Sequence, residues 1–262
     1  MEYKFIKYKI EDSIKLLTLN RPEVLNSFNR EMAQELFKAL ELAKDNENVR
    51  AVMITGEGKA FSAGQDLKEI ADGTGKLLDP GIVVKEVYNP LIKMIRCIEK
   101  PVVCAVNGVA AGAGANIALA CDFVVASSMA SFIQSFINVG LLPDSGGTFF
   151  LPRLAGLHRA SALMMLGEKI TCYEAFDLGL IYKVVEPEVL IKEATALSKR
   201  LAEMPTKSLG FIKRALNRSF NSDLDSQLEL EARLQQFAGM TDDYPEGVRA
   251  FIEKRKARFS GK

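Results

Sequence analysis

Short apolar runs alternate with amphipathic segments through the first two thirds of the chain. Residues 14–19, 51–55, 101–106 and 122–126 have the length and composition of buried strands. Between the first two, Met32, Leu36 and Leu40 recur at four-residue spacing behind Asn29, a candidate helix N-cap. A second helix is predicted over about 83–98. Strands that alternate with helices predict an α/β core with parallel pairing.

The final third carries mainly helical patterns. Thr171 and Glu174 have the spacing of a capping box, so a helix is predicted to begin there, followed by a strand over 181–185. Further helices are predicted over about 188–203, 206–219, 223–238 and 244–256. Apolar positions such as Phe211, Leu228 and Leu234 form faces that so short a tail cannot cover alone. Burial against the core or against another subunit is therefore expected.

Charge and cysteine content narrow the possible functions. The chain has 34 basic and 33 acidic residues, a net charge of +1, which argues against nucleic-acid binding but permits a local anion site. It has one histidine and no C-x-x-C, so we expect no metal site, and Cys97, Cys104, Cys121 and Cys172 are predicted to be reduced core residues. The N-terminus lacks a signal-peptide pattern, so we expect a cytoplasmic protein.

One uncharged run, residues 102–121, is about long enough to span a bilayer. It is rich in Ala and Gly, contains Asn107 and Asn116, and is divided by glycines. We therefore predict a buried strand, a tight turn and a buried helix rather than a membrane segment.

Two glycine-containing segments, 61–67 and 107–116, are predicted to be strand-to-helix turns. Neither offers an obvious catalytic side chain, but both place backbone N–H groups at helix N-termini, where a ligand can approach closely. Such a pair can polarise a carbonyl and stabilise an enolate. Taken singly, each set of glycines is explained equally well by turn closure or close helix packing. The second segment is not a dinucleotide fingerprint, because its third glycine is missing.

These segments belong to a longer series of motifs. In order they are Asn20-Arg21-Pro22 with Asn26, Ser62-Ala63-Gly64-x-Asp66-Leu67, Ala105-Val106-Asn107-Gly108-x-Ala110-x-Gly112-x-Gly114, Gly140-Leu141-x-Pro143-Asp144-x-Gly146-Gly147-Thr148, Ala175-x-x-x-Gly179-Leu180 and Phe251-x-x-Lys254-Arg255. Together they resemble the enoyl-CoA hydratase/isomerase (crotonase) family over essentially the whole chain.

The resemblance implies a crotonase-like spiral of ββα turns over residues 1–195, which holds the CoA and catalytic sites. It implies a helical C-terminal region, residues 196–262, which forms homotrimers that often pair into hexamers. The implied substrate is an acyl-CoA thioester, and no separate cofactor is implied.

The resemblance also implies roles for particular residues. The backbone N–H groups of Gln65 and Ala113 match the oxyanion hole of the family. The surface that holds CoA is matched by Val24, Leu25, Ala63, Asp66 and Leu67. Phe251 and Lys254 match tail residues that reach the CoA of a neighbouring subunit; the alternative for Lys254 is a solvated position in a charged run.

The implied reaction is isomerisation by one carboxylate. Where hydratases of this family carry two glutamates, this chain has Asn116 and Phe136, so we expect simple hydration to be weak or absent. Asp144 is the candidate acid/base, and its alternative role is a helix N-cap. Its apolar neighbours Leu141, Leu142, Phe149 and Phe150 are expected to raise its pKa by desolvation.

Further segments are Asn26-Ser27-Phe28, Ala63-Gly64-Gln65-Asp66-Leu67, Tyr88-Asn89-Pro90-Leu91, the turn over 108–115 and Asp243-Tyr244-x-Glu246-Gly247-Val248. Within the family, they resemble the subfamily of isomerases that convert ring-1,2-epoxyphenylacetyl-CoA into an oxepin-CoA. Phe28, Tyr88, Ile133 and Phe136 would form an apolar pocket for a ring, or they are ordinary core residues. Asn116 would orient substrate or water in that pocket, or is a buried residue at a helix start.

Several alternatives remain open at this point. The same site would serve a Δ3,Δ2-enoyl-CoA or dienoyl-CoA isomerase, and a non-catalytic CoA- or RNA-binding relative is a rival of another class. Dehalogenase-type hydrolysis is disfavoured by the single histidine, His158, which is expected on a helix surface. Residues 73–81 are predicted to form a mobile loop, and its closure over substrate is undecided.

Overall fold

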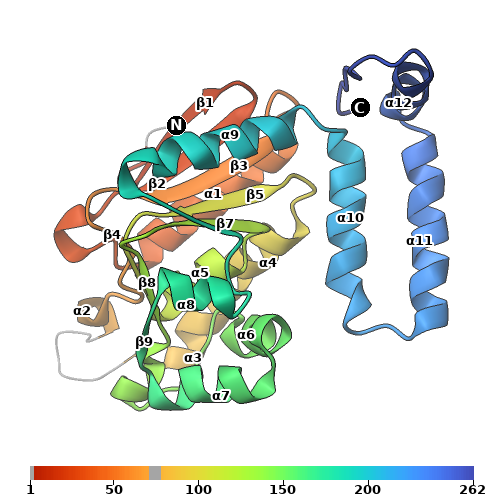
Figure 1. Cartoon of the computed structure of the whole chain (residues 1–262). Helices are drawn as coiled ribbons and strands as arrows, with labels where there is room; N and C mark the ends of the chain where they lie inside the picture. The colour runs from red at the N-terminus through yellow and green to blue at the C-terminus, as the bar shows by residue number, and fades with distance from the viewer. Residues whose placement is uncertain (1–2, 71–77) are drawn as a thin grey trace.

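The computed structural model describes residues 3–70 and 78–262, which form two β-sheets and their covering helices (Figure 1). The larger sheet has six strands in the order β1-β2-β3-β5-β7-β10. β1 and β2 pair antiparallel through Asp12 and Ser13, both with positive φ, and the other pairs are parallel. The strands are β1 Ile6–Glu11, β2 Ile14–Leu19, β3 Ala51–Gly56, β5 Val102–Val106, β7 Phe123–Ser127 and β10 Lys183–Val185.

The chain repeatedly passes from the larger sheet to a smaller one and then into a helix. β3 leads to β4 and α2, β5 leads to β6 and α5, and β7 leads to β8 and, further on, α6. This ββα repeat confirms the predicted fold class. The short strands were not predicted, because runs of three residues show no periodicity. The smaller sheet contains β4 Ala60–Ser62, β6 Val109–Ala111, β8 Ser131–Ile133 and β9 Lys169–Thr171, and the helices named are α2 Leu67–Ile70, α5 Gly112–Leu119 and α6 Gly147–Ala155.

The central strands are apolar throughout because both faces of the larger sheet are covered. Along β3, Val52 and Ile54 pack into the main core, beside the helix α1 Arg30–Asp45. Ala51 and Met53 point to the opposite face, which the helix α9 Leu190–Ala202 covers in Figure 1. The period-two alternation of a strand thus divides one continuous apolar run between two cores.

Helix positions agree with the sequence patterns more closely than the short strands do. The Asn29 side chain caps α1, and the Thr171–Glu174 capping box opens α8, as predicted. The remaining helical elements are α3 Pro80–Val83, α4 Asn89–Cys97, α7 Leu157–Leu166, α8 Cys172–Asp177, α10 Thr206–Ser219, α11 Leu224–Gly239 and α12 Asp243–Ile252, the 3₁₀ turns η1 Pro22–Val24, η3 Ser135–Val139 and η4 Pro187–Val189, and the π-helical η2 Val84–Tyr88.

Two helix predictions and one loop prediction are corrected. α12 ends at Ile252 rather than 256, because Lys254 adopts a left-handed conformation and the amide of Arg255 bonds to the carbonyl of Ala250, as in a Schellman motif. The predicted helix over 83–98 begins three residues earlier, at Pro80, and includes the π-helical turn η2. The loop predicted over 73–81 lies partly outside the described residues, and Pro80 already belongs to α3.

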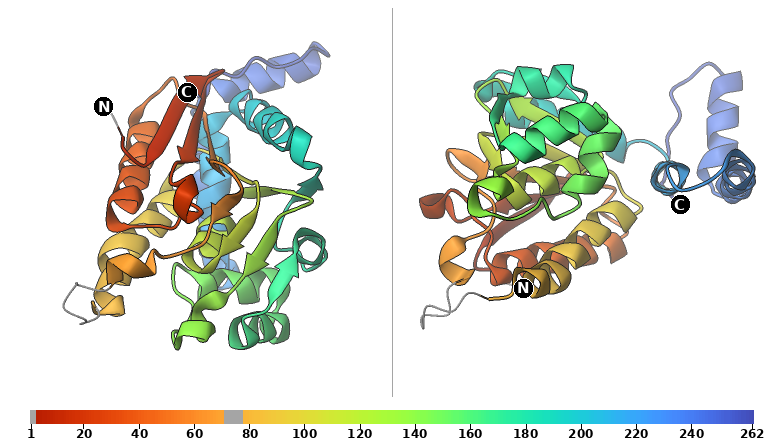
Figure 2. Two further views of the ribbon diagram at one scale, coloured as in Figure 1. Left: turned by 90° about the vertical axis from the view of Figure 1, so that its left-hand side faces the viewer. Right: turned by 90° about the horizontal axis from the view of Figure 1, so that it is seen from below.

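The C-terminal helices form an arm beside the core. Figure 1 shows α10 and α11 as an antiparallel pair, and the view from below in Figure 2 shows the arm standing away from the sheets. The division proposed between residues 195 and 196 falls inside α9, which packs on the larger sheet, so the change from core to arm follows α9. Several polar contacts attach α10 to the core, among them Lys213 to Asp122 (2.7 Å) and Arg96 to Asn217 (3.0 Å).

The remaining sequence expectations concern cysteines, membranes and metals. Cys104, Cys121 and Cys172 are buried, but Cys97 is exposed at the end of α4, so its assignment to the core was wrong. No helix among the described residues has the length and apolar character needed to cross a bilayer. Within residues 3–70 and 78–262, no three side chains of the metal-binding types cluster together.

Candidate active site

The first glycine segment connects β4 to α2 and passes close to the second. Gly64 has φ +93°, and a Cβ there would lie 2.9 Å from the carbonyl oxygen of Ala111 and 3.6 Å from the amide nitrogen of Ala113. A glycine is therefore required for this approach. The backbone N–H of Phe28 donates to the carbonyl of Gly64 (2.7 Å), and the carbonyl of Phe28 accepts from the amide of Asp66 (2.8 Å). Among the described residues, no acceptor is recorded for the intervening amide of Gln65.

The second segment is a short strand followed by a helix, not the simple turn that was predicted. Its residues 109–111 form β6, and α5 begins at Gly112. Ala113 is the second residue of α5, so its N–H has no intrahelical partner and points out of the positive end of the helix. A Cβ on Gly114 would lie 2.6 Å from Cβ of Ser62, so that glycine serves close packing. The amides of Gln65 and Ala113 are thus neighbours.

Asp144 lies in the loop between η3 and α6, and it is half-buried. Its carboxylate accepts a hydrogen bond from the Ser145 hydroxyl (2.7 Å). Burial raises the pKa of Asp144, and the bond from Ser145 opposes that shift. The N-cap of α6 is Gly146, without a side-chain cap, so the alternative of a helix cap does not hold for Asp144. This carboxylate remains available to a ligand.

Asn116 holds the loop that carries Asp144. Its side-chain amide donates to the backbone carbonyl of Asp144 (2.8 Å) and accepts from Gln134 (2.9 Å). A Cβ on Gly147 would lie 2.4 Å from Nδ2 of Asn116, so this contact requires glycine at the start of α6. Asn116 is fully buried and does not line the pocket, which corrects its placement among the acyl-pocket residues. The sequence did not predict that Asn116 supports this loop, although a glycine at position 147 is consistent with a close contact there.

One pocket of about 260 Å³ brings the candidate groups together. Phe136 and Tyr88 line it as expected, whereas Phe28 lies behind Tyr88 in an edge contact at 6.4 Å and Ile133 is not in the wall. Of the neighbours expected to desolvate Asp144, only Leu141 lines the pocket, and Leu142 is 74% exposed. The described lining is Ala63, Gly64, Gln65, Leu67, Pro80, Val83, Val84, Tyr88, Gly112, Ala113, Ser135, Phe136, Asn138, Val139, Leu141 and Asp144.

That lining contains a single carboxylate, Asp144. The two positions where hydratases of the family carry glutamates hold a structural amide, Asn116, and an aromatic ring, Phe136. One carboxylate beside two free backbone amides can transfer a proton next to a polarised carbonyl. The described lining offers no second carboxylate that could activate water.

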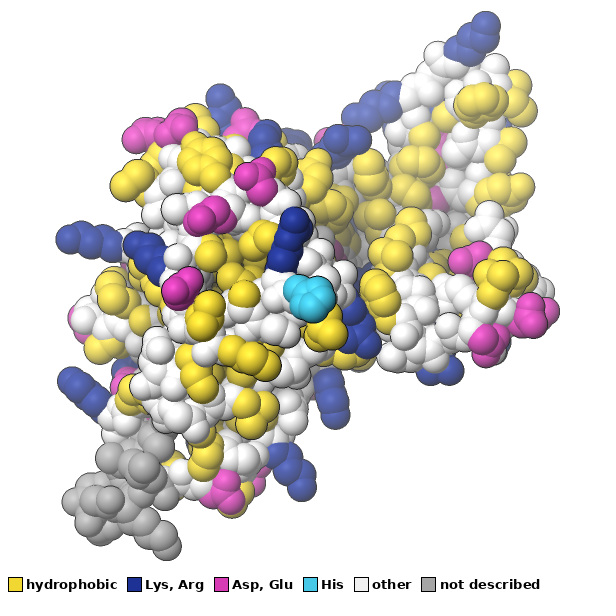
Figure 3. Space-filling model, turned by 60° about the horizontal axis from the view of Figure 1, so that its bottom comes forward, with side chains coloured by type: hydrophobic (Ala, Val, Ile, Leu, Met, Phe, Trp, Pro, Cys, Tyr) yellow, Lys and Arg dark blue, Asp and Glu magenta, His cyan; other side chains and the backbone are white. Residues whose placement is uncertain are grey.

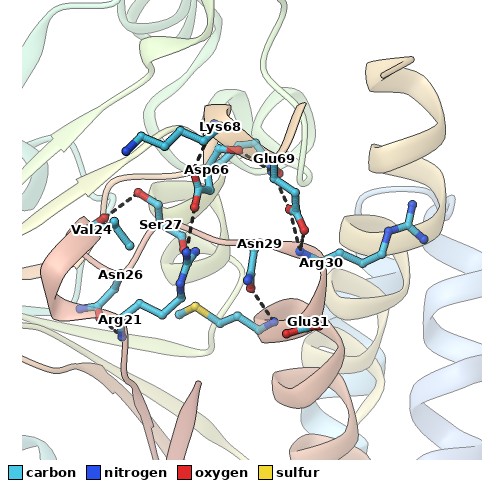
Figure 4. A network of polar contacts seen from close by, with 12 residues as sticks. Arg21, Val24, Asn26, Ser27, Asn29, Arg30, Glu31, Asp66, Lys68 and Glu69 are labelled. Carbon is cyan, nitrogen blue, oxygen red and sulfur yellow. Dashed lines mark hydrogen bonds and ion pairs between the residues drawn. The ribbon is translucent and has the colours of Figure 1, made fainter. Parts of the chain in front are cut away.

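The segment expected to bind CoA is fixed by buried polar contacts (Figure 4). The Asn26 side chain bonds to the backbone of Arg21 (2.9 Å), Glu57 (2.9 Å) and Ala60 (2.8 Å), which holds Leu25 and Asn26 in left-handed conformations. Val24 closes the turn η1, and Leu25 accepts the amide of Ala63 (2.9 Å). The expected CoA surface therefore adjoins the pocket.

The carboxylate of Asp66 forms contacts within the chain. It pairs with Arg21 (2.9 Å) and accepts the amide of Lys68 (3.1 Å), while Arg21 also bonds to the carbonyl of Ser27 (2.7 Å). Figure 4 shows these groups joining the segment of η1 to the start of α2. Asp66 therefore shapes the surface that is expected to bind CoA, with Leu67 exposed next to it.

Phe251 and Lys254 do not line this pocket. Phe251 is 86% exposed on α12 and borders a separate apolar hollow of the arm. Lys254 follows α12 in the left-handed turn. His158 is exposed on α7 and visible in Figure 3, as expected for a helix-surface residue.

Comparisons with known proteins identify the family to which this fold belongs. The model of the family "Enoyl-CoA hydratase/isomerase" matches residues 9–262. The chain belongs to the enoyl-CoA hydratase/isomerase family.

Named relatives perform different reactions. The chain is 46% identical to the 1,2-epoxyphenylacetyl-CoA isomerase of Escherichia coli (strain K12), with 99% of each chain covered. It is 40% identical to the trans-2-decenoyl-[acyl-carrier-protein] isomerase of Streptococcus mutans over 100% of both chains. It is 35% identical to the crotonyl-CoA hydratase of Syntrophomonas wolfei, again over 100% of both.

Solved structures share the fold. The enoyl-CoA hydratase of Bacillus anthracis matches with a TM-score of 0.93 at 31% identity, covering 99% of this chain and 100% of that one. The enoyl-CoA hydratase of Polaromonas sp. JS666 matches with a TM-score of 0.91 at 36% identity, covering 97% and 99%. The family and the fold are thus established, while the relatives include both isomerases and hydratases.

Proposed function

We propose that this protein isomerises an acyl-CoA thioester with Asp144 as its acid/base. The single observation that carries the proposal is a lone carboxylate with a raised pKa in an apolar pocket, next to the amides of Gln65 and Ala113. The two amides hold the thioester oxygen and stabilise the negative charge that develops on it. Both hydratase glutamate positions lack a carboxylate, which favours isomerisation over hydration.

In the proposed reaction, the carboxylate of Asp144 removes a proton from a carbon α or γ to the thioester. The electron pair left on carbon delocalises onto the thioester oxygen as an enolate, held by the two amides. The protonated Asp144 then returns the proton to a different carbon, so the net composition of the substrate is unchanged. A carboxyl group with a raised pKa is suited to both the removal and the return of the proton.

The proposed substrate is ring-1,2-epoxyphenylacetyl-CoA, which would be converted to an oxepin-CoA. Two observations support it: the similarity to the Escherichia coli enzyme of that name, and the aromatic walls of the pocket, Tyr88 and Phe136. The second candidate is a Δ3,Δ2-enoyl-CoA or dienoyl-CoA isomerase. The isomerase from Streptococcus mutans, whose name specifies an unsaturated fatty acyl group, favours that candidate.

We also propose that the arm assembles the chain into a trimer, single or paired into a hexamer. An apolar hollow of about 940 Å³ lies among α10, α11 and α12, lined by exposed side chains such as Ile212, Leu228 and Phe251. Figure 3 shows hydrophobic side chains along the arm and beside it. A second copy that covers this surface would bring Phe251 and Lys254 within reach of a neighbouring CoA, their expected role.

The test is a panel of three substrates given to the purified protein: the ring epoxide, a 3-enoyl-CoA and crotonyl-CoA. We expect isomerisation of the epoxide to be fastest, isomerisation of the 3-enoyl-CoA to be slower, and hydration of crotonyl-CoA to be negligible. A 3-enoyl-CoA turned over faster than the epoxide would establish the second candidate. Hydration faster than either isomerisation would contradict the proposal that Asp144 acts alone.

A further inference from the structure

Tyr88 places a phenolic hydroxyl in the wall of the candidate pocket. The residue is 2% exposed to bulk solvent and lines the same pocket as Asp144 and Phe136. Its hydroxyl donates a hydrogen bond to Oε1 of Gln65. The proposed acid/base chemistry does not use this hydroxyl, so its presence in a largely apolar pocket calls for a separate explanation.

The position of the Tyr88 ring is built into the fold. It ends the π-helical turn η2, directly before α4. Such turns are uncommon and often occur at functional sites, because the extra residue changes which side chains face a given direction. Phe28 contacts the ring edge-on, with 6.4 Å between ring centres and 70° between planes. The ring is therefore packed against Phe28, and its hydroxyl bonds to Gln65, another residue of the pocket lining.

Among the residues that the structure describes, the hydrogen-bonding capacity of the Tyr88 hydroxyl is only partly used. A phenol has one hydrogen to donate and two lone pairs that can accept. The side-chain nitrogen of Gln65 lies toward the carbonyl of Asp66 (3.3 Å) and the carboxylate of Glu69 (3.5 Å), which leaves its oxygen for Tyr88. Burial, followed by the negative charge of Asp144, raises the pKa of Tyr88, so the phenol keeps its hydrogen.

We propose that Tyr88, oriented by Gln65, recognises an oxygen atom on the acyl group, so that the preferred substrates are acyl-CoA thioesters bearing a hydroxyl, ether or epoxide oxygen. A substrate hydroxyl donates to a free lone pair of the phenol. An ether or epoxide oxygen accepts the phenolic hydrogen when it turns away from Gln65. This inference rests on the proposed function, because it takes the pocket around Asp144 as the acyl site, and it adds the residue that selects for an oxygen on the acyl group.

A pair of non-reacting ligands tests the inference by binding alone. Phenylacetyl-CoA and 2-hydroxyphenylacetyl-CoA differ by one oxygen, and calorimetric titration of the intact protein gives both dissociation constants. We expect the hydroxylated ligand to bind about five- to tenfold more tightly, the usual range for one neutral hydrogen bond. In Tyr88→Phe this ratio should fall to about one, through weaker binding of the hydroxylated ligand only. Tyr182→Phe, the same change at an exposed tyrosine, should keep the wild-type ratio.

Equal affinities of the wild-type protein for the two ligands would overturn the inference, and so would an undiminished ratio in Tyr88→Phe. The wild-type ratio decides the matter even if the variant fails to fold, although the substitution retains the ring that contacts Phe28. No turnover is required. An Asp144→Asn enzyme that remained active would sink the proposed function without changing these affinities, so the two failures are distinguishable.

Discussion

Two hollows among the described residues, one in the arm and one around Asp144, differ in character, and the smaller of the two has the features of a site. The hollow of the arm measures about 940 Å³ and that around Asp144 about 260 Å³. The arm hollow also includes two carboxylates, but Glu231 is exposed and Asp243 already accepts the amides of Ser260 (2.6 Å) and Gly261 (2.9 Å). Among the described residues, the carboxylate of Asp144 has one hydrogen-bond partner, the neighbouring Ser145.

The comparison shows that the candidate active site is indicated by pocket-lining polar groups that remain available to a ligand, and not by the volume of the hollow. The largest apolar pocket is the usual first hypothesis for a binding site. Here the larger hollow is lined mainly by apolar side chains, its carboxylate Asp243 is already paired and Glu231 is exposed, which suits association between subunits. The smaller hollow combines the free amides of Gln65 and Ala113 with a carboxylate that burial makes more basic.

Asp144→Asn should have the largest effect. An amide cannot exchange the proton, so turnover should fall by about 10²–10⁴-fold, the usual contribution of a positioned acid/base. Binding of acyl-CoA, measured by calorimetry, should change little. The control is Asp225→Asn on the exposed surface of α11, which should retain full turnover. Normal turnover in Asp144→Asn would remove the distinction drawn between the two hollows.

Leu228→Glu should abolish the subunit association proposed for the hollow of the arm. A charge at this half-exposed apolar position would have to be desolvated between copies, so the assembly should dissociate to monomers. Light scattering coupled to size-exclusion chromatography measures the mass. Ile10→Glu, also an exposed apolar position but on β1, should leave the assembly intact. Retention of the assembled mass by Leu228→Glu would refute the trimer built through the arm.

Asn116→Ala tests whether Asn116 positions the carboxylate of Asp144 in the smaller hollow. Loss of its bonds leaves the carbonyl of Asp144 and the amide of Gln134 without these partners, which costs roughly 1–3 kcal/mol of stability. Misplacement of the carboxylate should lower kcat by about tenfold, with a smaller effect on KM. Asn116→Asp should be worse, since its charge would repel that carbonyl. An effect on stability with kcat unchanged would show a structural role only.

The pH dependence of turnover should reflect the raised pKa of Asp144. Removal of a proton from substrate requires the ionised carboxylate, so activity falls as pH drops through the pKa of the folded protein. The acid limb of the kcat/KM profile should therefore lie above the ordinary aspartate value of about 3.9. In Asp144→Asn, any residual turnover should lack that limb. An acid limb at or below the ordinary value would contradict desolvation of this carboxylate.

The smallest expected effect is on stability. A carboxyl group whose folded pKa is raised binds protons more readily in the folded state, so its contribution to stability declines as pH rises from the unfolded pKa through the folded one. Asp144→Asn removes this cost and should raise the melting temperature slightly at neutral pH. The difference should disappear below the ordinary aspartate range. Scanning calorimetry at several pH values measures it, and a variant less stable at neutral pH would oppose the assignment.

The sequence predicted those parts of the fold that depend on local patterns. The continuous apolar run of β3 and the cap at Asn29 are local signals, and both are confirmed. The end of α12 was missed because a left-handed lysine gives no compositional signal. The strands of the smaller sheet were missed because each has three residues, and only contacts between distant segments show them.

The candidate site divides in the same way. Gln65, Ala113 and Asp144 were identified through motif resemblance, and the structure places them around one pocket. The bond of Asn116 to Asp144 spans 28 positions of the sequence and depends on the glycine at position 147, so periodicity could not predict it. The position of the Tyr88 hydroxyl depends on the π-helical turn η2, and the sequence of η2 does not differ from that of an ordinary helix.

The most direct test of the central claim is a crystal structure with a bound, non-reacting acyl-CoA thioester. Our account predicts that the amide nitrogens of Gln65 and Ala113 both lie about 2.7–3.1 Å from the thioester oxygen. It also predicts that a carboxylate oxygen of Asp144 lies within about 3.5 Å of the carbon that loses its proton. A thioester oxygen bound by neither amide, or a carboxylate turned away from the acyl chain, would contradict it.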